Sequence, residues 1–121
     1  MKILYLEDDA NDAKFASLYF KTTAHQLHIV GTIDEAEAAL ASDDGFDVLL
    51  IDIMLWHARD GYTFIRALRD RGVHQPIVAV TELATPQDRE IGLQSGATHI
   101  LQKPFRVTEL AKLIDTINTS L

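Results

Sequence analysis

The sequence predicts an α/β fold: a doubly wound parallel sheet with helices on both faces. Short apolar runs alternate with helix-like segments along all 121 residues, and no linker, internal repeat or low-complexity stretch separates them. Strand–helix units repeated in this way imply a parallel sheet, and right-handed crossovers distribute the helices over both faces. The length is that of one domain, which we expect to span residues 1–121.

Five short apolar runs are the predicted strands of this sheet. Continuous apolar runs of this length are typical of parallel strands that are buried on both faces, although periodicity alone does not exclude a buried helix. The runs are Ile3–Leu6, Leu27–Val30, Val48–Ile51, Ile77–Val80, and Ile100–Leu101 with Thr98 before them.

Helical segments are predicted between and after these runs. The first is expected from Asp12 to Thr22, and the second from an N-cap at Asp34, with Glu37 three residues later. Apolar residues at helical spacing predict the third and the fifth helix. They are Phe64, Ile65 and Leu68 in the third, and Leu110, Leu113, Ile114, Ile117 and Leu121 in the fifth.

The fourth helix has the clearest boundaries. Thr85 offers a capping hydroxyl, Pro86 suits the first helical position, and Asp88 places an acid in the first turn. Gly96 is expected to end this helix, because glycine adopts the left-handed conformation at little cost.

Composition excludes several classes of function. Eleven basic against eighteen acidic residues give a net charge of −7, whereas a nucleic-acid-binding domain needs a basic surface. The absence of cysteine excludes disulfides and thiolate chemistry. The apolar run at the start, Met1–Leu6, is too short for a signal peptide or a membrane span. We therefore expect a cytoplasmic protein that contacts neither nucleic acid nor membrane.

Polar residues follow four of the predicted strands. Ligands of doubly wound sheets bind at the carboxyl ends of the strands, so these groups are expected to converge. Clustered carboxylates suit Mg²⁺, which prefers hard oxygen ligands, and a carboxylate can attack phosphorus to give an aspartyl phosphate. An amine and a hydroxyl would then stabilise the phosphoryl oxygens. The residues are Glu7-Asp8-Asp9, Asp52, Thr81 and Lys103-Pro104-Phe105.

The order of these pieces resembles the receiver domains of bacterial response regulators, and the resemblance covers the whole chain. It implies a flavodoxin-like receiver fold with strand order 2-1-3-4-5 and five helices. The implied function is a phosphorylation-dependent signalling switch, not an enzyme, which catalyses only its own phosphorylation and dephosphorylation. The segments that match the family pattern are Leu6-Glu7-Asp8-Asp9, Asp47–Asp52, Asp60-Gly61, Val80-Thr81, Gly96-Ala97 and Lys103-Pro104-Phe105.

The resemblance implies a role for each matching residue. Asp52 would be the phosphoacceptor, Thr81 the switch hydroxyl and Lys103 the phosphate-binding amine. The peptide bond before Pro104 is usually cis in this motif. The metal would be Mg²⁺, held by Glu7, Asp8, Asp52 and the backbone carbonyl of Met54.

Four positions depart from the family pattern. Trp56 replaces a usual proline, and Gly61 follows Asp52 by nine residues instead of eight, so the loop holds one extra residue. Glu82 stands where a small residue is usual. Ile100 replaces the usual aromatic rotamer switch and is stiff at χ1.

Residues around the expected site lead to three further expectations. The phosphoryl group should repel Glu82 and move the start of the fourth helix, unless Glu82 already lies in solvent. Apolar Met54 and Leu83 cannot orient an in-line water, so the phosphate should be lost slowly. Mg²⁺ binding should change the fluorescence of Trp56, the sole tryptophan.

The resemblance also implies partners. The donor would be a histidine kinase or a histidine phosphotransfer protein, docked on the first helix. Phe15 and Leu18 are candidate contacts, unless both belong to the core. A downstream protein or output domain would read the face formed by the fourth helix, the fifth strand and the fifth helix.

Other functions remain alternatives. A pseudo-receiver would use the same fold as a phosphorylation-independent interaction module, which Glu82 and Ile100 favour. A Mg²⁺-dependent phosphatase would need an Asp-x-Asp turn after the first strand, and Glu7-Asp8-Asp9 does not provide one. The sequence also has no Gly-x-x-x-x-Gly-Lys phosphate loop. His25 and His28 lack further ligands for a metal.

Overall fold

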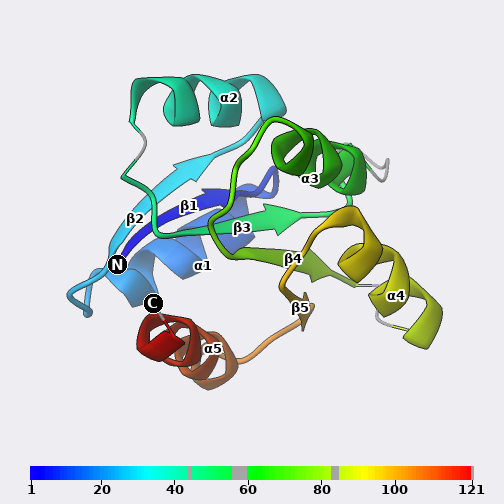
Figure 1. The fold of residues 1–121 in the computed structure, drawn as a ribbon. Helices are drawn as coiled ribbons and strands as arrows, with labels where there is room; N and C mark the ends of the chain where they lie inside the picture. The colour runs from blue at the N-terminus through cyan, green and yellow to red at the C-terminus, as the bar shows by residue number, and fades with distance from the viewer. Residues whose placement is uncertain (44, 56–59, 83–84, 121) are drawn as a thin grey trace.

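Strands and helices alternate along the whole chain (Figure 1). The computed structural model describes residues 1–43, 45–55, 60–82 and 85–120. All five predicted strands are confirmed to within two residues. Among the described residues, no helix is both long and apolar enough to cross a membrane. The elements are β1 (Lys2–Leu6), α1 (Ala10–Phe20), β2 (Gln26–Val30), α2 (Ile33–Ser42), β3 (Val48–Asp52), α3 (Asp60–Asp70), β4 (Ile77–Thr81), α4 (Pro86–Ser95), β5 (His99–Gln102) and α5 (Val107–Ser120).

The strands form one parallel sheet in the predicted order, β2-β1-β3-β4-β5. Side chains alternate between the two faces of each strand. In β1, Ile3 and Tyr5 pack toward α1 and α5, whereas Leu4 and Leu6 pack toward α2 and α3. Figure 1 shows α2 and α5 on opposite sides of the sheet. The predicted doubly wound arrangement is confirmed.

The middle of the sheet is fully buried, which explains the continuous apolar runs. Every residue of β3 and of β4 is buried. Burial of one large aliphatic side chain, such as Leu49 or Ile77, contributes about 1.5–3 kcal/mol. Because helices cover both faces of these strands, neither face is exposed to solvent, and the strands do not alternate polar and apolar residues.

The first helix begins earlier than predicted, because the capping residue is Asp9. Its Oδ1 accepts hydrogen bonds from the backbone N–H groups of Asn11 at 2.8 Å and of Asp12 at 3.0 Å. The helix therefore spans Ala10–Phe20, and the predicted bounds Asp12–Thr22 are wrong. Placing the helix directly after β1 brings its first turn to the carboxyl edge of the sheet.

The predicted N-cap of the second helix is also wrong. Thr32, not Asp34, caps α2: its backbone is extended, and its Oγ1 accepts a hydrogen bond from the N–H of Glu35 at 3.1 Å. Asp34 instead lies in the first turn, where its charge is favourable at the positive end of the helix.

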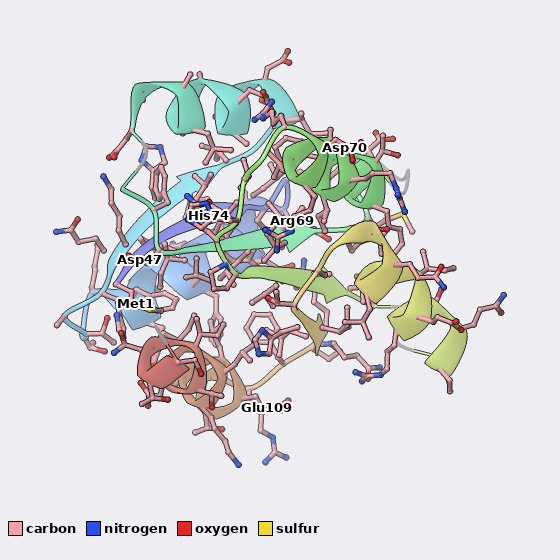
Figure 2. The ribbon with its side chains drawn as sticks, in the orientation of Figure 1. Met1, Asp47, Arg69, Asp70, His74 and Glu109 are labelled. Atoms are coloured by element: carbon pink, nitrogen blue, oxygen red, sulfur yellow. The ribbon has the colours of Figure 1, made fainter. Side chains whose placement is uncertain are left out.

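The predicted boundaries of α4 are confirmed. Thr85 Oγ1 accepts from the N–H of Asp88 at 3.1 Å, and Pro86 takes the first helical position. Gly96 ends the helix with φ 120°, a conformation that favours glycine. Its carbonyl accepts from Nε of Arg69 at 2.9 Å, and Figure 2 shows Arg69 extending from α3. This contact ties the carboxyl ends of α3 and α4 together.

Candidate functional site

Three polar side chains predicted from the sequence lie buried at the carboxyl edge of the sheet. Asp52 and Thr81 are the last residues of β3 and β4, and Glu7 follows β1 directly. The strands pair in register, so their ends lie level. Glu7 is 2 % exposed, and Asp52 and Thr81 are each 4 % exposed. Carboxylates are almost never so buried without partners, so the site must supply them.

Lys103 is the partner of these carboxylates. Its backbone N–H donates to the carbonyl of Thr81 at 2.8 Å, which holds the residue at the end of β4. Its Nζ pairs with Oε1 of Glu7, with Oδ2 of Asp52 at 3.2 Å and with Oδ2 of Asp12 at 3.1 Å. One ammonium therefore faces three carboxylates, and it balances only part of their charge. The predicted cis peptide bond between Lys103 and Pro104 is confirmed.

The uncompensated negative charge changes the proton affinities at this edge. Burial and the neighbouring Asp52 carboxyl raise the pKa of Glu7 to about 9, although the Lys103 ammonium opposes this. Burial alone would lower the pKa of Lys103, but the hydrogen bond to Glu7 and the charge of Asp52 outweigh it and raise that pKa. Lys103 therefore stays charged, and an additional cation would be favourable.

The residues present fit a divalent cation. Glu7, Asp8 and Asp52 each offer a carboxylate oxygen, and these oxygens lie within 4.8 Å of one another. Opposite ligands of an octahedral Mg²⁺ are about 4 Å apart, and Mg²⁺ prefers such hard oxygens. Oε2 of Glu7 is buried without a hydrogen-bond partner among the described residues. The N–H of Met54 donates to Oδ1 of Asp52 at 3.2 Å, so Met54 also borders this cluster.

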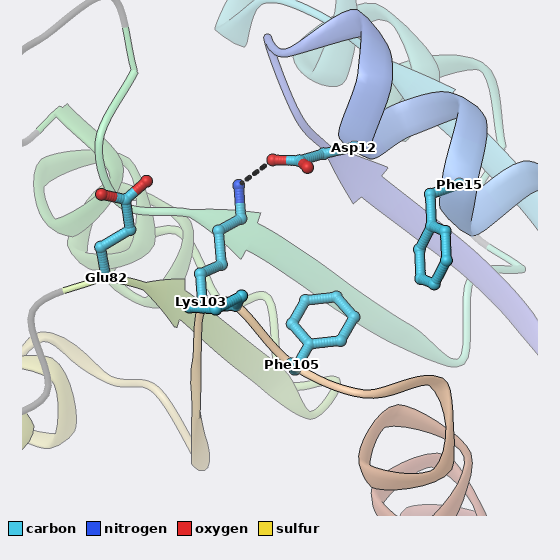
Figure 3. Close-up of a pocket in the computed structure, with 6 residues that line it drawn as sticks. Asp12, Phe15, Glu82, Lys103 and Phe105 are labelled. Atoms are coloured by element: carbon cyan, nitrogen blue, oxygen red, sulfur yellow. Dashed lines mark hydrogen bonds and ion pairs between the residues drawn. The ribbon is translucent and has the colours of Figure 1, made fainter.

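Two adjoining cavities open at this edge. The first, about 430 Å³, lies over the carboxylates and has room for a phosphoryl group. The second, about 450 Å³, adds apolar walls from Phe15 and Phe105. Figure 3 shows Asp12 and Glu82 on opposite sides of Lys103. Asp12, Glu82 and Lys103 line both cavities; Asp8, Asp9, Asp52 and Met54 complete the first, and Phe15, Pro104 and Phe105 the second.

Gly61 allows α3 to pack directly against the end of β3. A Cβ at this position would lie 2.5 Å from both the carbonyl oxygen of Asp52 and the Cα of Ile53. The N–H of Gly61 also donates to the carbonyl of Ile53 at 3.1 Å. Only glycine permits this approach, which supports the backbone that carries Asp52. The loop residues 56–59, with Trp56 and His57, lie outside the described residues.

Two features near the site are not predicted from the sequence. Asp12 was expected only as the start of a helix, yet it binds Lys103 from the first turn of α1. The sequence pattern predicts Tyr5 only as part of an apolar strand, yet its buried hydroxyl has no partner among the described residues. The position of Asp12 shortly after the end of β1 is the sequence signal that could have placed it at the site. No local pattern distinguishes Tyr5 from the other residues of its strand.

The sequence of this chain matches a known protein family over most of its length. The response regulator receiver domain family matches residues 3–115. The chain belongs to this family. A probable transcriptional regulatory protein, SilR of Salmonella typhimurium, is 34% identical over 119 residues, covering 97% of this chain and 50% of the relative. Transcriptional regulatory protein TcrA of Mycobacterium tuberculosis is 32% identical over 112 residues, covering 91% and 43%. The receiver thus spans about half the length of these relatives or less.

Solved receiver domains share the fold. The BeF3-activated receiver of Klebsiella pneumoniae RstA has a TM-score of 0.84 and 28% identity, covering 96% of this chain and 97% of its own. The receiver of sensor histidine kinase PA1611 of Pseudomonas aeruginosa has a TM-score of 0.82 and 28% identity, covering 97% of each chain. In the latter structure a magnesium ion is coordinated in the active-site cleft.

In this receiver, Ile100 of β5 packs between α3 and α4. A Cβ on Gly92 would lie 2.7 Å from Cδ1 of Ile100 and 3.5 Å from the ring of Tyr62. The hydroxyl of Tyr62 donates to the carbonyl of Asp88 at 3.4 Å. A glycine notch in α4 therefore accommodates the branched side chain that replaces the usual aromatic residue.

Two surface predictions can be compared with the structure. Phe15 is 48% and Leu18 is 55% exposed, so the alternative that both belong to the core is wrong. Glu82 is exposed, which agrees with the alternative that it already lies in solvent. Its response to phosphorylation stays a prediction. Leu83 lies outside the described residues, as does Leu121.

Proposed function

We propose that residues 1–121 form one receiver domain that accepts a phosphoryl group on Asp52 and signals the change to a partner. The observation that carries the proposal is the buried carboxylate of Asp52, with Oδ2 3.2 Å from Nζ of Lys103, on the wall of a cavity of about 430 Å³. A nucleophile, a cation and space for a phosphoryl group occur together there.

The chemistry is transfer to a carboxylate. An oxygen of Asp52 attacks the phosphorus of a phosphohistidine, and the P–N bond breaks. Its electron pair returns to the imidazole nitrogen, which takes up a proton. Lys103 and the hydroxyl of Thr81 would bind phosphoryl oxygens as charge develops on them. The domain catalyses only its own phosphorylation and dephosphorylation.

Mg²⁺ is the cofactor that this donor set suits. Glu7, Asp8, Asp52 and the backbone carbonyl of Met54 would hold it, and it would supply positive charge to the phosphoryl oxygens. Lys103 balances only part of the charge of its three carboxylate partners, so the metal and the phosphoryl group are expected to bind together.

The phosphoryl donor is proposed to be a histidine kinase or a histidine phosphotransfer protein of the cytoplasm. Phe15 and Leu18 on α1 are exposed, and Phe15 also borders the cavity that contains Lys103 and Phe105. An apolar surface beside the acceptor suits a protein donor. Phe15→Ala should slow transfer from a phosphorylated kinase while leaving labelling by acetyl phosphate unchanged; equal slowing with both donors would contradict this docking surface.

The output is proposed to be a change of the face formed by α4, β5 and α5, read by a downstream protein or output domain. Ile100 links β5 to α4 through Gly92, and Leu93 of α4 is 54% exposed on the surface. Amide hydrogen exchange with and without a phosphoryl mimic would test this. Comparison of wild type with Glu82→Ala would show whether Glu82 drives the response.

Phosphorylation itself is tested by intact mass. Incubation with acetyl phosphate and millimolar Mg²⁺ should add about 80 Da, the mass of one phosphoryl group on a carboxylate. Asp52→Asn keeps the size of the side chain and should abolish the gain. Asp9→Asn is the matched control, because asparagine caps a helix as well as aspartate and the residue lines the same cavity.

The outcomes separate the candidate functions. Labelling of wild type and Asp9→Asn, but not of Asp52→Asn, supports the proposal. Full labelling of Asp52→Asn would refute the assignment of the acceptor. A wild type that is not labelled, and that does not bind Mg²⁺ at millimolar concentration, would favour a phosphorylation-independent interaction module.

A further inference from the structure

α4 buries little of its surface, and the part that it buries lies in its second half. Its buried residues are Gly92 and Ser95, neither of which has a large apolar side chain. In the first half, residues 86–90, Asp88 is partly buried and the other four residues are exposed. α3, by contrast, buries three large apolar side chains. The hydrophobic effect therefore does little to hold α4 in place, and polar contacts matter more.

Two arginines of α3 hold the carboxyl end of α4. Nε of Arg69 donates to the carbonyl of Gly96 at 2.9 Å, and Nη2 of Arg66 donates to the carbonyl of Gln94 at 3.1 Å. The last turn of α4 contains no basic residue of its own, so α3 supplies the cations that stabilise the negative end of this helix. Figure 1 shows this end of α4 turned toward α3.

Arg69 is itself fixed, so it can anchor the helix. Its Nη1 donates to the carbonyl of Val73 at 2.9 Å and to that of Gln75 at 2.8 Å, in the segment between α3 and β4. A Cβ on Gly96 would lie 2.5 Å from Cγ of Arg69, so the backbone of α4 lies directly against this side chain. One planar guanidinium thus joins the end of α4 to α3 and to the segment that leads into β4.

The contacts become weaker toward the amino end of α4. At Gly92 the helix still packs closely, because an added Cβ would lie 2.7 Å from Cδ1 of Ile100. Nearer the amino end, the hydroxyl of Tyr62 donates to the carbonyl of Asp88 at 3.4 Å, whereas such bonds are usually about 2.7–2.8 Å long. The Thr85 cap closes the first turn within the helix itself. It keeps this turn helical without attaching it to α3.

We propose that α4 rotates about its carboxyl end, with Arg69 as the fixed point of the hinge, when the site at Asp52 is loaded. The inference rests on the proposed function, since a phosphoryl group at Asp52 drives the rotation. Thr81 ends β4, and α4 is the next helix along the chain. A displacement of Thr81 therefore reaches α4 at its less firmly held end, while Arg69 resists displacement at the other end.

Distances between pairs of spin labels test the rotation, with beryllofluoride and Mg²⁺ as the probe of the loaded site. The chain has no cysteine, so labels attach only where cysteine is introduced. Gln87→Cys in the first turn and Gln94→Cys in the last turn of α4 are each paired with one of two references. The references are Ala38→Cys on α2 and Lys14→Cys on α1; all four positions are exposed.

The hinge predicts unequal movement of the two ends. With a rise of 1.5 Å per residue, a rotation of about 10–15° about Gly96 would move residue 87 by about 2–4 Å and residue 94 by less than about 1 Å. The distances from Gln87→Cys should therefore change on addition of beryllofluoride, and those from Gln94→Cys should stay nearly constant. Equal changes at both ends, a larger change at Gln94→Cys, or no change in protein that gains mass with acetyl phosphate would overturn the rotation.

Variants of α3 test the hinge in metal-free protein. Arg69→Met keeps a long stem and deletes the bonds to Gly96, Val73 and Gln75, so the distances from the Gln94 label should become broader. Arg106→Met, which changes an exposed arginine just before α5, is the matched control and should leave them as in wild type.

Tyr62→Phe is the milder variant, because it removes one hydroxyl. It should broaden the distances from the Gln87 label but not those from the Gln94 label. Distributions from the Gln94 label that are as narrow in Arg69→Met as in wild type would overturn the role of Arg69. A wild type that gains no mass with acetyl phosphate and does not respond to beryllofluoride would overturn the proposed function. The two metal-free variants still decide, in that case, whether α4 is hinged at its carboxyl end.

Discussion

Removing the ammonium of Lys103 tests the electrostatic account of the site. Lys103→Met keeps a long stem but deletes the bonds to Glu7, Asp12 and Asp52. The Asp12 side chain is 51% exposed, so the ion pair between Asp12 and Lys103 contributes little to stability. Removing one partner of a buried pair costs about 3–5 kcal/mol. The raised pKa of Glu7 means that this carboxyl group already holds a proton in metal-free protein at neutral pH, which lessens the cost, so we expect a loss of about 2–3 kcal/mol.

The measurement is urea unfolding at neutral pH, first in EDTA and then with millimolar Mg²⁺. Mg²⁺ should restore most of the lost stability, because a bound cation replaces the missing charge among the carboxylates. Lys112→Met, an exposed lysine on α5, should change stability little under either condition. If Lys103→Met is as stable as wild type in EDTA, or if Mg²⁺ restores nothing, the electrostatic reasoning is wrong.

Three further predictions follow from the same edge of the sheet. Gly61→Ala should lose about 1–3 kcal/mol or more in urea unfolding, because its Cβ would meet the carbonyl of Asp52 at 2.5 Å; unchanged stability would contradict this packing. Metal-free protein should lose stability as pH rises from 4.5 toward about 9, because folded Glu7 keeps a proton that unfolded Glu7 releases. Glu7→Gln should flatten this dependence of stability on pH. A variant whose stability falls with pH as steeply as that of the wild type would count against the role of Glu7. Asp12→Asn should speed labelling by acetyl phosphate about 2- to 5-fold by releasing Lys103 from a surface pair, whereas slower labelling would mean that Asp12 assists transfer.

Local patterns were sufficient to predict the sheet and the general place of the site. The strand runs were recognisable because strands covered on both faces must be apolar throughout, as in Val48–Ile51. Thr85 and Gly96 marked the ends of α4 because caps depend on backbone conformation within a few residues. Asp52 and Lys103 could be placed at one edge because parallel strands bring their carboxyl ends together.

The capping errors show where local information becomes ambiguous. Asp9 and Thr32 cap the first two helices, although Asp12 and Asp34 are equally good capping residues by type. The choice depends on where the preceding strand ends and at what angle the chain leaves it. A cap is therefore decided by the packing of strand and helix, not by the residue alone.

Other features existed only once the chain was folded. Lys103 meets Asp12 and Glu7 across more than ninety residues of sequence, so no local pattern could pair them. The exposure of Phe15 and the close approach at Gly61 depend likewise on which surfaces the layers cover. The same holds for the Tyr5 hydroxyl, which has no partner among the residues that the structure describes. The sequence determined the elements and the reactive groups through short-range geometry and hydrophobic pattern. The tertiary structure decided how these groups are paired and which remain without a partner, because burial and electrostatic strength depend on the packing of distant segments.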